Sequence, residues 1–352
     1  MKSRREFLKI ALAVGATAPS RGWAAGRQLE KELVFSGRGG SLGDVWKRSV
    51  IPPFEKKFNC KVTYVTNDST PAFAKIVAER HRPQTDVLWA TDQTHQQGVA
   101  MGVFEKFDAS QVPNLANLYD FARYKNNVGV WWSVGAAVME YNAQIYKERN
   151  IPAPTSWSDF WVPEVKGRVL WMDLTTLQGL VSFLMINKLA GGSEKNVDPG
   201  FNLLKSHLKD VVGIVSSPSQ VDEMLQQKSA WLVPNQLARV LLLKGAGVPV
   251  EAGYPKEGIP ATGLQLEVIK GAPHPNLGLE FVNWVLTDEM QLIVARDMAL
   301  GPVSKTLRLD PKVAARVIYG EDKVSRLVNF DYDVIGANFG KWVERWNREF
   351  AR

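Results

Sequence analysis

Cysteine is nearly absent from this sequence of 352 residues, which contains only Cys60. An internal disulfide is therefore impossible, and a lone thiol in an oxidising compartment is safe from unwanted chemistry when it is buried. Because Cys60 lies between Phe58 and Val62, we expect it at the entry of a buried strand. A reactive nucleophile is the less favoured interpretation.

Motifs for metal binding and catalysis are missing as well. The four histidines are scattered, with no HExxH pair and no cysteine neighbours, so we expect no metal site. No GxSxG elbow and no GKS or GKT phosphate loop occurs. The SxxK match from Ser206 to Lys209 lacks its companion motifs. These absences argue against an enzyme and against a bound cofactor.

The apolar run near the start of the chain is too short to span a membrane, which takes about 20 residues. Arg4 and Arg5 precede this run, Ile10–Ala18, and small residues follow up to Ala25. The pattern resembles the bacterial twin-arginine export signal, which serves proteins that fold before export. We therefore predict a signal peptide over residues 1–25 and a periplasmic protein.

The charge balance excludes a strongly basic surface. The formal net charge is +7, but residues 1–25 hold five basic residues against one acid. The remaining chain therefore carries only about +3, which gives no support for nucleic-acid binding. Charged residues at 22% and hydrophobic residues at 45% indicate a folded chain with a large core.

Strand and helix patterns alternate along the rest of the chain. Apolar runs at 32–36, 61–65 and 86–89 predict strands, with helical patterns between them. Two adjacent extended runs follow over 128–141, and a second α/β series begins at 168. This alternation predicts an α/β protein with parallel strands and helices on the faces of the sheets.

A glycine-rich turn, Gly37–Gly43, follows the first predicted strand and begins a helix. It is not a dinucleotide fingerprint, because Leu42 stands where the third glycine is needed. Free backbone N–H groups in this turn could hold an anion or a carbonyl group. A tight turn without a ligand is the alternative.

A series of short motifs resembles, in order and spacing, the bacterial extracellular solute-binding proteins, a group that includes spermidine/putrescine, ferric-iron and phosphonate binders. The resemblance covers nearly all of the chain after the predicted signal peptide. The motifs are Gly39–Asp44, Pro53–Phe58, Pro113–Asn117, Gly135–Asn142, Thr155–Asp159, Val165–Gly167, Tyr254–Gly258, Lys270–Pro275 and Gly301–Val303.

The resemblance implies a two-lobed periplasmic-binding-protein fold of type II, in which each lobe is a mixed sheet flanked by helices. Two crossovers between the lobes are expected, near Trp132–Ala136 and near Ala261–Leu264. The solute is expected in the cleft beyond the strand ends, as in open parallel sheets generally. The implied division is 26–133 with about 264–305 for lobe 1, 134–263 for lobe 2, and 306–352 for C-terminal helices that pack on the lobes.

The implied function is that of the substrate-binding component of an ABC importer. Such a protein captures a small solute between its lobes and delivers it to the permease subunits in the membrane. We expect a monomer with no cofactor and no metal. An exported enzyme that folds around a cofactor before twin-arginine export is the rival hypothesis, and a role as a chemoreceptor partner is compatible with the first.

Polar and aromatic residues at predicted strand ends form the candidate ligand site. The segment after Gly258 lacks the acid and tryptophan of polyamine binders, and Pro234–Arg239 stands where ferric binders have adjacent tyrosines. The resemblance therefore favours an anionic or neutral solute, with Arg239 as a bidentate partner. A cation stacked on Trp89 or Trp132 is the competing hypothesis. The candidate ligand-binding residues are Gly39, Gly40, Ser41, Trp89, Asp92, Gln93, Trp132, Thr175, Thr176, Asn235, Arg239 and Thr262.

Overall fold

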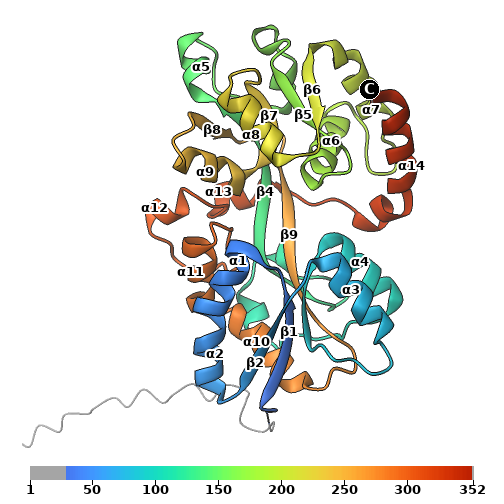
Figure 1. Ribbon diagram of the computed structural model, residues 1–352, viewed down its shortest axis with the longest axis vertical. Coiled ribbons are helices and arrows are strands. Elements are labelled where there is room, and N and C mark those ends of the chain that lie inside the picture. Colours follow the sequence, from blue (N-terminus) through green and yellow to red (C-terminus); the bar gives the residue numbers. More distant parts are fainter. Residues whose placement is uncertain (1–28, 351–352) are drawn as a thin grey trace, which may run out of the picture.

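Two α/β lobes, joined by long strands, make up the protein (Figure 1). The computed structural model describes residues 29–350, so the predicted signal peptide lies outside the described residues. Strands β4 (Val130–Asn142) and β9 (Ile259–Val268) run antiparallel to each other and pass through both lobes. The predicted two-lobed fold is confirmed.

Lobe 1 is built on a mixed sheet with the order β2-β1-β3-β9-β4. Strand β1 is parallel to β2 and β3, whereas β3 is antiparallel to β9. The strands are β1 (Glu32–Gly37), β2 (Lys61–Thr66) and β3 (Val87–Thr91). The helices are α1 (Gly40–Val45), a π-helical turn (Trp46–Val50), α2 (Ile51–Phe58), α3 (Ser69–Ala78), α4 (Asp92–Met101), α10 (Pro275–Val285) and α11 (Asp288–Asp297).

Lobe 2 continues the sheet as β4-β7-β5-β6, and β8 pairs with the other edge of β4. Its strands are β5 (Val169–Met172), β6 (Val211–Val215), β7 (Leu232–Gln236) and β8 (Val250–Gly253). Its helices are α5 (Ala143–Glu148), α6 (Leu177–Leu189), α7 (Asp198–Ser206), α8 (Pro218–Gln226) and α9 (Leu237–Gly245). Short 3₁₀ turns lie at Pro113–Asn117, Asp120–Ala122, Trp157–Trp161, Pro163–Val165 and Leu208–Asp210.

A third segment also passes between the lobes. After α11 the chain forms α12 (Pro311–Ala314) and α13 (Glu321–Val324), and then β10 (Leu327–Val328), which pairs in parallel with β9. The last helix, α14 (Tyr332–Phe350), packs on lobe 2 (Figure 1). The sequence analysis expected two crossovers, and this segment adds a third connection because the apolar face of α14 is buried in the core of lobe 2.

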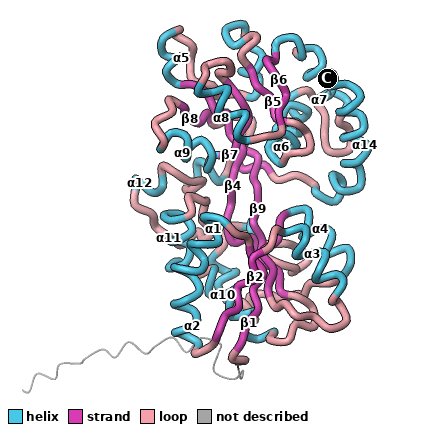
Figure 2. The backbone as a smooth tube through the Cα atoms, in the orientation of Figure 1, coloured by secondary structure: helices cyan, strands magenta, loops and turns pink. Residues whose placement is uncertain are grey.

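The strands lie inside each lobe and the helices outside (Figure 2), and the core of lobe 1 continues into lobe 2, where a second aromatic-rich cluster lies. In lobe 1, Trp46 packs against both Phe35 and Trp89, with ring centroids 4.8 and 5.9 Å apart. In lobe 2, Phe160 and Trp171 form a comparable edge-on pair at 5.1 Å. Aromatic burial of this kind makes each lobe a stable body.

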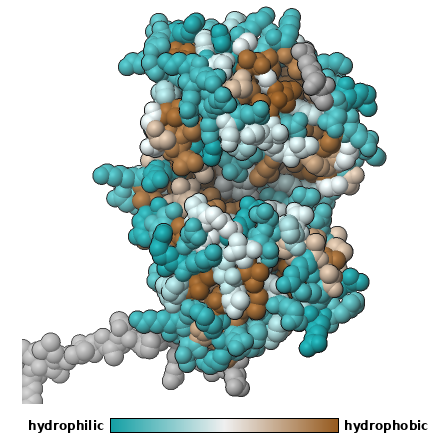
Figure 3. All heavy atoms as spheres, viewed as in Figure 1, coloured by the Kyte–Doolittle hydropathy of each residue, from teal (hydrophilic) through white to brown (hydrophobic). Residues whose placement is uncertain are grey.

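The surface is mostly hydrophilic and is hollowed between the two lobes (Figure 3). No helix within residues 29–350 is long and apolar enough to cross a membrane.

Candidate ligand site

The strand ends of lobe 1 that face lobe 2 present the first group of predicted residues. Strand β1 ends at Gly37, and Gly39, Gly40 and Ser41 follow as an exposed turn that begins α1. Gly40 has a φ of +70°, which a residue without a Cβ adopts at little cost. The turn therefore follows β1 and is exposed, and its part in ligand binding stays a prediction.

Arg38 lies beside this turn and was not among the predicted residues. Its Nε donates to Ser69 Oγ at 3.2 Å, and its guanidinium carbon lies 5.7 Å from the ring centroid of Trp89. Burial lowers the pKa of Arg38, and the charge of Asp68 partly offsets that effect. Within residues 29–350 no carboxylate forms an ion pair with this guanidinium. Arg38 is thus a half-buried cation at the cleft with free N–H groups.

Asp92 and Gln93 begin α4 directly after β3. The Thr91 side chain accepts from the Thr94 backbone N–H at 3.4 Å and caps the helix, which fixes the position of this turn. Gln93 is exposed, whereas Asp92 is only 6% exposed. The Asp92 carboxylate accepts from Gln265 Nε2 at 2.5 Å, and burial raises its pKa to about 7.

The contacts of Asp92 place it at the base of the cleft. Its second oxygen accepts from the backbone N–H of Gly263 at 3.4 Å, where β9 passes between the lobes. Thr262, the next residue on that strand, is buried, and its Oγ1 is so close to Gly135 of β4 that a Cβ there would lie 2.5 Å from it. Thr262 therefore belongs to the packed hinge.

Below Asp92, a buried polar network ties α4 to β9. His95 Nδ1 lies 2.7 Å from Glu267 Oε1, and its ring stacks on Tyr124 at 3.8 Å. The Tyr124 hydroxyl in turn accepts from Trp131 Nε1 at 2.7 Å. Burial raises the pKa of Glu267, while His95 lowers it. His95 and Glu267 are fully buried, and this network holds the helix that carries Asp92.

Trp89 and Trp132 lie in the core of lobe 1. Their side chains are 1% and 0% exposed, and their rings meet edge to face at 5.1 Å. Trp46 packs against both rings. A ligand cation that stacked on either ring would have to displace these neighbours or, at Trp89, the Arg38 guanidinium.

In lobe 2, the predicted threonines lie directly before α6. Thr176 Oγ1 accepts from the Gly179 backbone N–H at 3.0 Å and caps the helix, while Thr175 is exposed. Both the backbone N–H and the hydroxyl of Thr175 donate to Asp173 Oδ1. The other oxygen, Oδ2, accepts from Trp346 Nε1 at 3.0 Å. The Asp173 carboxylate is therefore already engaged by groups of the protein.

Asn235 and Arg239 are likewise engaged within lobe 2. Asn235 Nδ2 donates to Glu140 Oε2 at 2.7 Å, and burial raises the pKa of Glu140 to about 7. Arg239 donates to both oxygens of Asp222, with Nε 3.1 Å from Oδ1. This bidentate pair uses the fork geometry that the sequence analysis expected a ligand to use. The structure thus brings Asn235 and Arg239 together with Glu140 and Asp222.

Comparisons with known proteins identify the family. A family model described as bacterial extracellular solute-binding protein matches residues 49–320. The chain belongs to this family. The predicted role in solute binding is confirmed at this level, because the family consists of extracellular solute-binding proteins.

Individual relatives are distant but cover most of the chain. The spermidine/putrescine-binding periplasmic protein of Escherichia coli (strain K12) is 25% identical over 285 residues, which is 75% of this chain and 78% of that protein. An uncharacterized protein of Haemophilus influenzae is 24% identical, with 98% of each chain covered. A crystal structure of an ABC transporter protein from Clostridium perfringens has a TM-score of 0.81 at 24% identity, and covers 90% of this chain and 99% of its own.

Proposed function

We propose that this protein captures a small anionic solute in the cleft between its lobes, in the periplasm, and delivers it to the permease subunits of an ABC importer. We further propose that residues 1–25 direct twin-arginine export and that the protein works as a monomer. A neutral solute is the second candidate, and a polyamine or ferric ion fits the residues at the cleft less well.

Arg38 is the observation that supports an anionic solute. A guanidinium has five N–H donors, and Arg38 uses its Nε on Ser69. Its remaining donors form the planar fork that binds carboxylate, phosphate or phosphonate groups in bidentate fashion. Because the side chain is half-buried, its charge is weakly screened, so it attracts an anion and repels a polycation.

The acids near the cleft are poorly placed for a polyamine. Asp173 is bonded to Thr175 and Trp346, and Asp222 is neutralised by Arg239. Asp92 is buried and bonded to Gln265. Residues 29–350 also contain no group of three or more His, Cys, Asp or Glu side chains that could share a metal ion. The proposal therefore keeps the predicted turn Gly39–Ser41 and the threonines of α6, and moves the charged anchor from Arg239 to Arg38.

The experiment is a thermal-shift screen of phosphate esters, phosphonates, carboxylates, polyols, polyamines and ferric ion, on protein refolded to remove any bound solute. A ligand at 100 times its Kd stabilises the folded state by about 2.7 kcal/mol, which raises the melting temperature by several degrees. We expect an anion to give the largest shift. Stabilisation by polyamines alone would refute the proposal.

The anion identified in the screen then tests the anchor by calorimetric titration. Loss of a hydrogen bond to a charged group costs about 1.5–3 kcal/mol, so Arg38→Gln should weaken binding about 10- to 100-fold. Arg80→Gln, the same charge change at an exposed position of lobe 1, is the matched control and should bind normally. Arg239→Gln decides between the two arginines. Loss of binding in Arg239→Gln but not in Arg38→Gln would return the anchor to Arg239.

A further inference from the structure

The C-terminal helix α14 is anchored firmly on lobe 2. Its residues Trp342, Trp346 and Phe350 are buried in the core of that lobe. The Trp346 indole donates to Asp173 beside α6, and Arg345 pairs with Asp198 at the start of α7. The helix therefore moves as part of lobe 2.

The first turn of the same helix reaches lobe 1, where it packs against α4 (Figure 1). Tyr332 stands beside the Asp92 carboxylate, and burial together with this carboxylate raises the pKa of its phenol. The Tyr332 hydroxyl is buried but has no completed hydrogen bond. Gln265 Oε1, on the residue that bonds Asp92, is also buried without a partner. The Tyr332 hydroxyl of α14 thus lies near the Asp92 carboxylate of lobe 1 without a completed bond.

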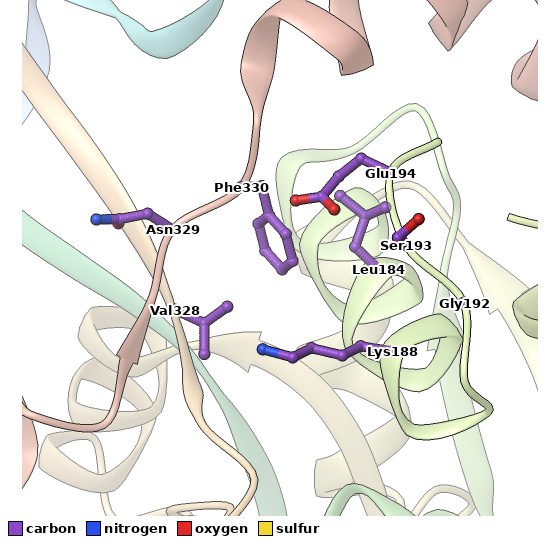
Figure 4. A pocket seen from close by; sticks show the side chains of 8 residues that line it. All are labelled: Leu184, Lys188, Gly192, Ser193, Glu194, Val328, Asn329 and Phe330. Carbon is purple, nitrogen blue, oxygen red and sulfur yellow. The ribbon is translucent and has the colours of Figure 1, made fainter. Parts of the chain in front are cut away.

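The segment that leads into Tyr332 is held on the lobe 2 side. Strand β10 pairs with β9 at Ile259 and Pro260, and the backbone N–H of Asp331 donates to Glu194 Oε1 at 3.1 Å. Val328 and Phe330 line a small pocket with Leu184 and Lys188 of α6 (Figure 4). Tyr332 is therefore supported on both sides by contacts that do not depend on lobe 1.

We propose that α14 is a strap across the cleft and that Tyr332 and Asp92 form an interlobe latch. The inference rests on the two-lobed capture mechanism of the proposed function. When the lobes close, the Tyr332 hydroxyl donates to the Asp92 carboxylate, and the buried hydroxyl gains the partner that it lacks. When the lobes open, the bond breaks, because its two members are fixed to different lobes. Asp92, predicted from the sequence as a ligand residue, is thereby assigned to lobe closure.

The test measures the separation of the lobes without any solute, so it is independent of whether Arg38 binds an anion. Spin labels are attached to cysteines introduced by Lys56→Cys in α2 and Gln144→Cys in α5, both at exposed positions. The background substitution Cys60→Ser removes the native thiol. Double electron–electron resonance then gives the distance distribution. Tyr332→Phe keeps the ring and removes only the hydroxyl, and we expect the closed-to-open ratio to fall roughly tenfold, as loss of one charge-assisted hydrogen bond predicts.

Two further variants make the result decisive. Asp92→Asn should open the lobes as well, and Tyr332→Phe added to it should change nothing more, because the two residues act through one bond. Tyr146→Phe, which alters a buried phenol inside lobe 2, is the control and should keep the original distribution. A distribution that is unchanged in Tyr332→Phe, or that changes equally in Tyr146→Phe, would overturn the latch. Circular dichroism of each variant confirms that the fold is retained.

Discussion

Glu140 gives the sharpest test of the electrostatics of lobe 2. It lies on the long strand β4, is fully buried, and binds Asn235 with one oxygen, while its other oxygen has no partner. Its pKa is raised from an ordinary value of 4.5 to about 7, mainly by burial and also by Asp222, although Asn235 and Arg239 act to lower it. The substitution Glu140→Gln keeps the size and an oxygen for Asn235 but cannot ionise.

The sign of the effect follows from proton binding. Between pH 4.5 and about 7 the folded state keeps the Glu140 proton that the unfolded state has lost. The stability contributed by this group is complete below pH 4.5 and is lost as the pH rises through 7, by about 1.4 kcal/mol per pH unit. Over this window the loss amounts to about 3 kcal/mol. Glu140→Gln removes this part of the pH dependence, while Asp92 and Glu267, whose pKa values burial also raises, maintain the rest.

The assay is urea unfolding at pH 5 and pH 8.5. The change in the free energy of unfolding caused by Glu140→Gln should be about 2–3 kcal/mol more stabilising at pH 8.5 than at pH 5. Glu344→Gln, at an exposed position of α14, is the control and should shift stability by less than about 0.5 kcal/mol at either pH. If Glu140→Gln and the unaltered protein lose stability in parallel, Glu140 is already ionised at pH 5 and the reasoning fails.

Two other predictions concern the C-terminal helix and export. Trp346→Ala removes a ring that is 1% exposed and its bond to Asp173, so thermal unfolding should show a loss of roughly 3–5 kcal/mol; a loss below 1 kcal/mol would mean that α14 is not anchored as described. Replacing Arg4 and Arg5 together by Lys should leave unprocessed precursor in the cytoplasm, as judged by immunoblots of cell fractions. Normal amounts of mature protein in the periplasm would refute the twin-arginine hypothesis.

The strands were predictable where a short apolar run is bounded by turn residues. The sequence indicates strands over 32–36 and 61–65, and the structure has them over 32–37 and 61–66. The extended runs within 128–141 turned out to be one strand, β4, that serves both lobes. Local pattern could not show this, because the two halves of β4 pair with different strands, β9 and β7, and the strand continues through Gly135 without a turn.

The site was less predictable, because its members are joined by long-range contacts. Arg239 looked like a free cation from its place after β7, but Asp222, 17 residues earlier, binds it. Arg38 lies in the turn that the sequence analysis singled out for its glycines, and it was not predicted as a ligand residue. Its proposed role as the anion anchor depends on its contacts with Ser69 and Trp89. Spacing along the chain does not show such pairings. The predicted strand ends therefore indicated where the cleft lies, but not which of its residues are free to bind a solute.

The affinity of a two-lobed binder depends on its contacts with the solute and on the fraction of molecules able to close. Gly135 and Gly263 lie where β4 and β9 cross, packed so tightly that a Cβ at either would lie within 2.6 Å of a neighbour. Because glycine has no side chain, bending of the backbone at these positions is not opposed by a clash of their own Cβ atoms. The contacts made when the lobes close therefore decide the populations of the open and closed forms. A difference of 1.4 kcal/mol changes the closed fraction about tenfold when that fraction is small, and the observed affinity changes with it. The contact of the solute with Arg38 and the latch formed by Tyr332 would therefore both increase the observed affinity, although the two residues lie on opposite lobes.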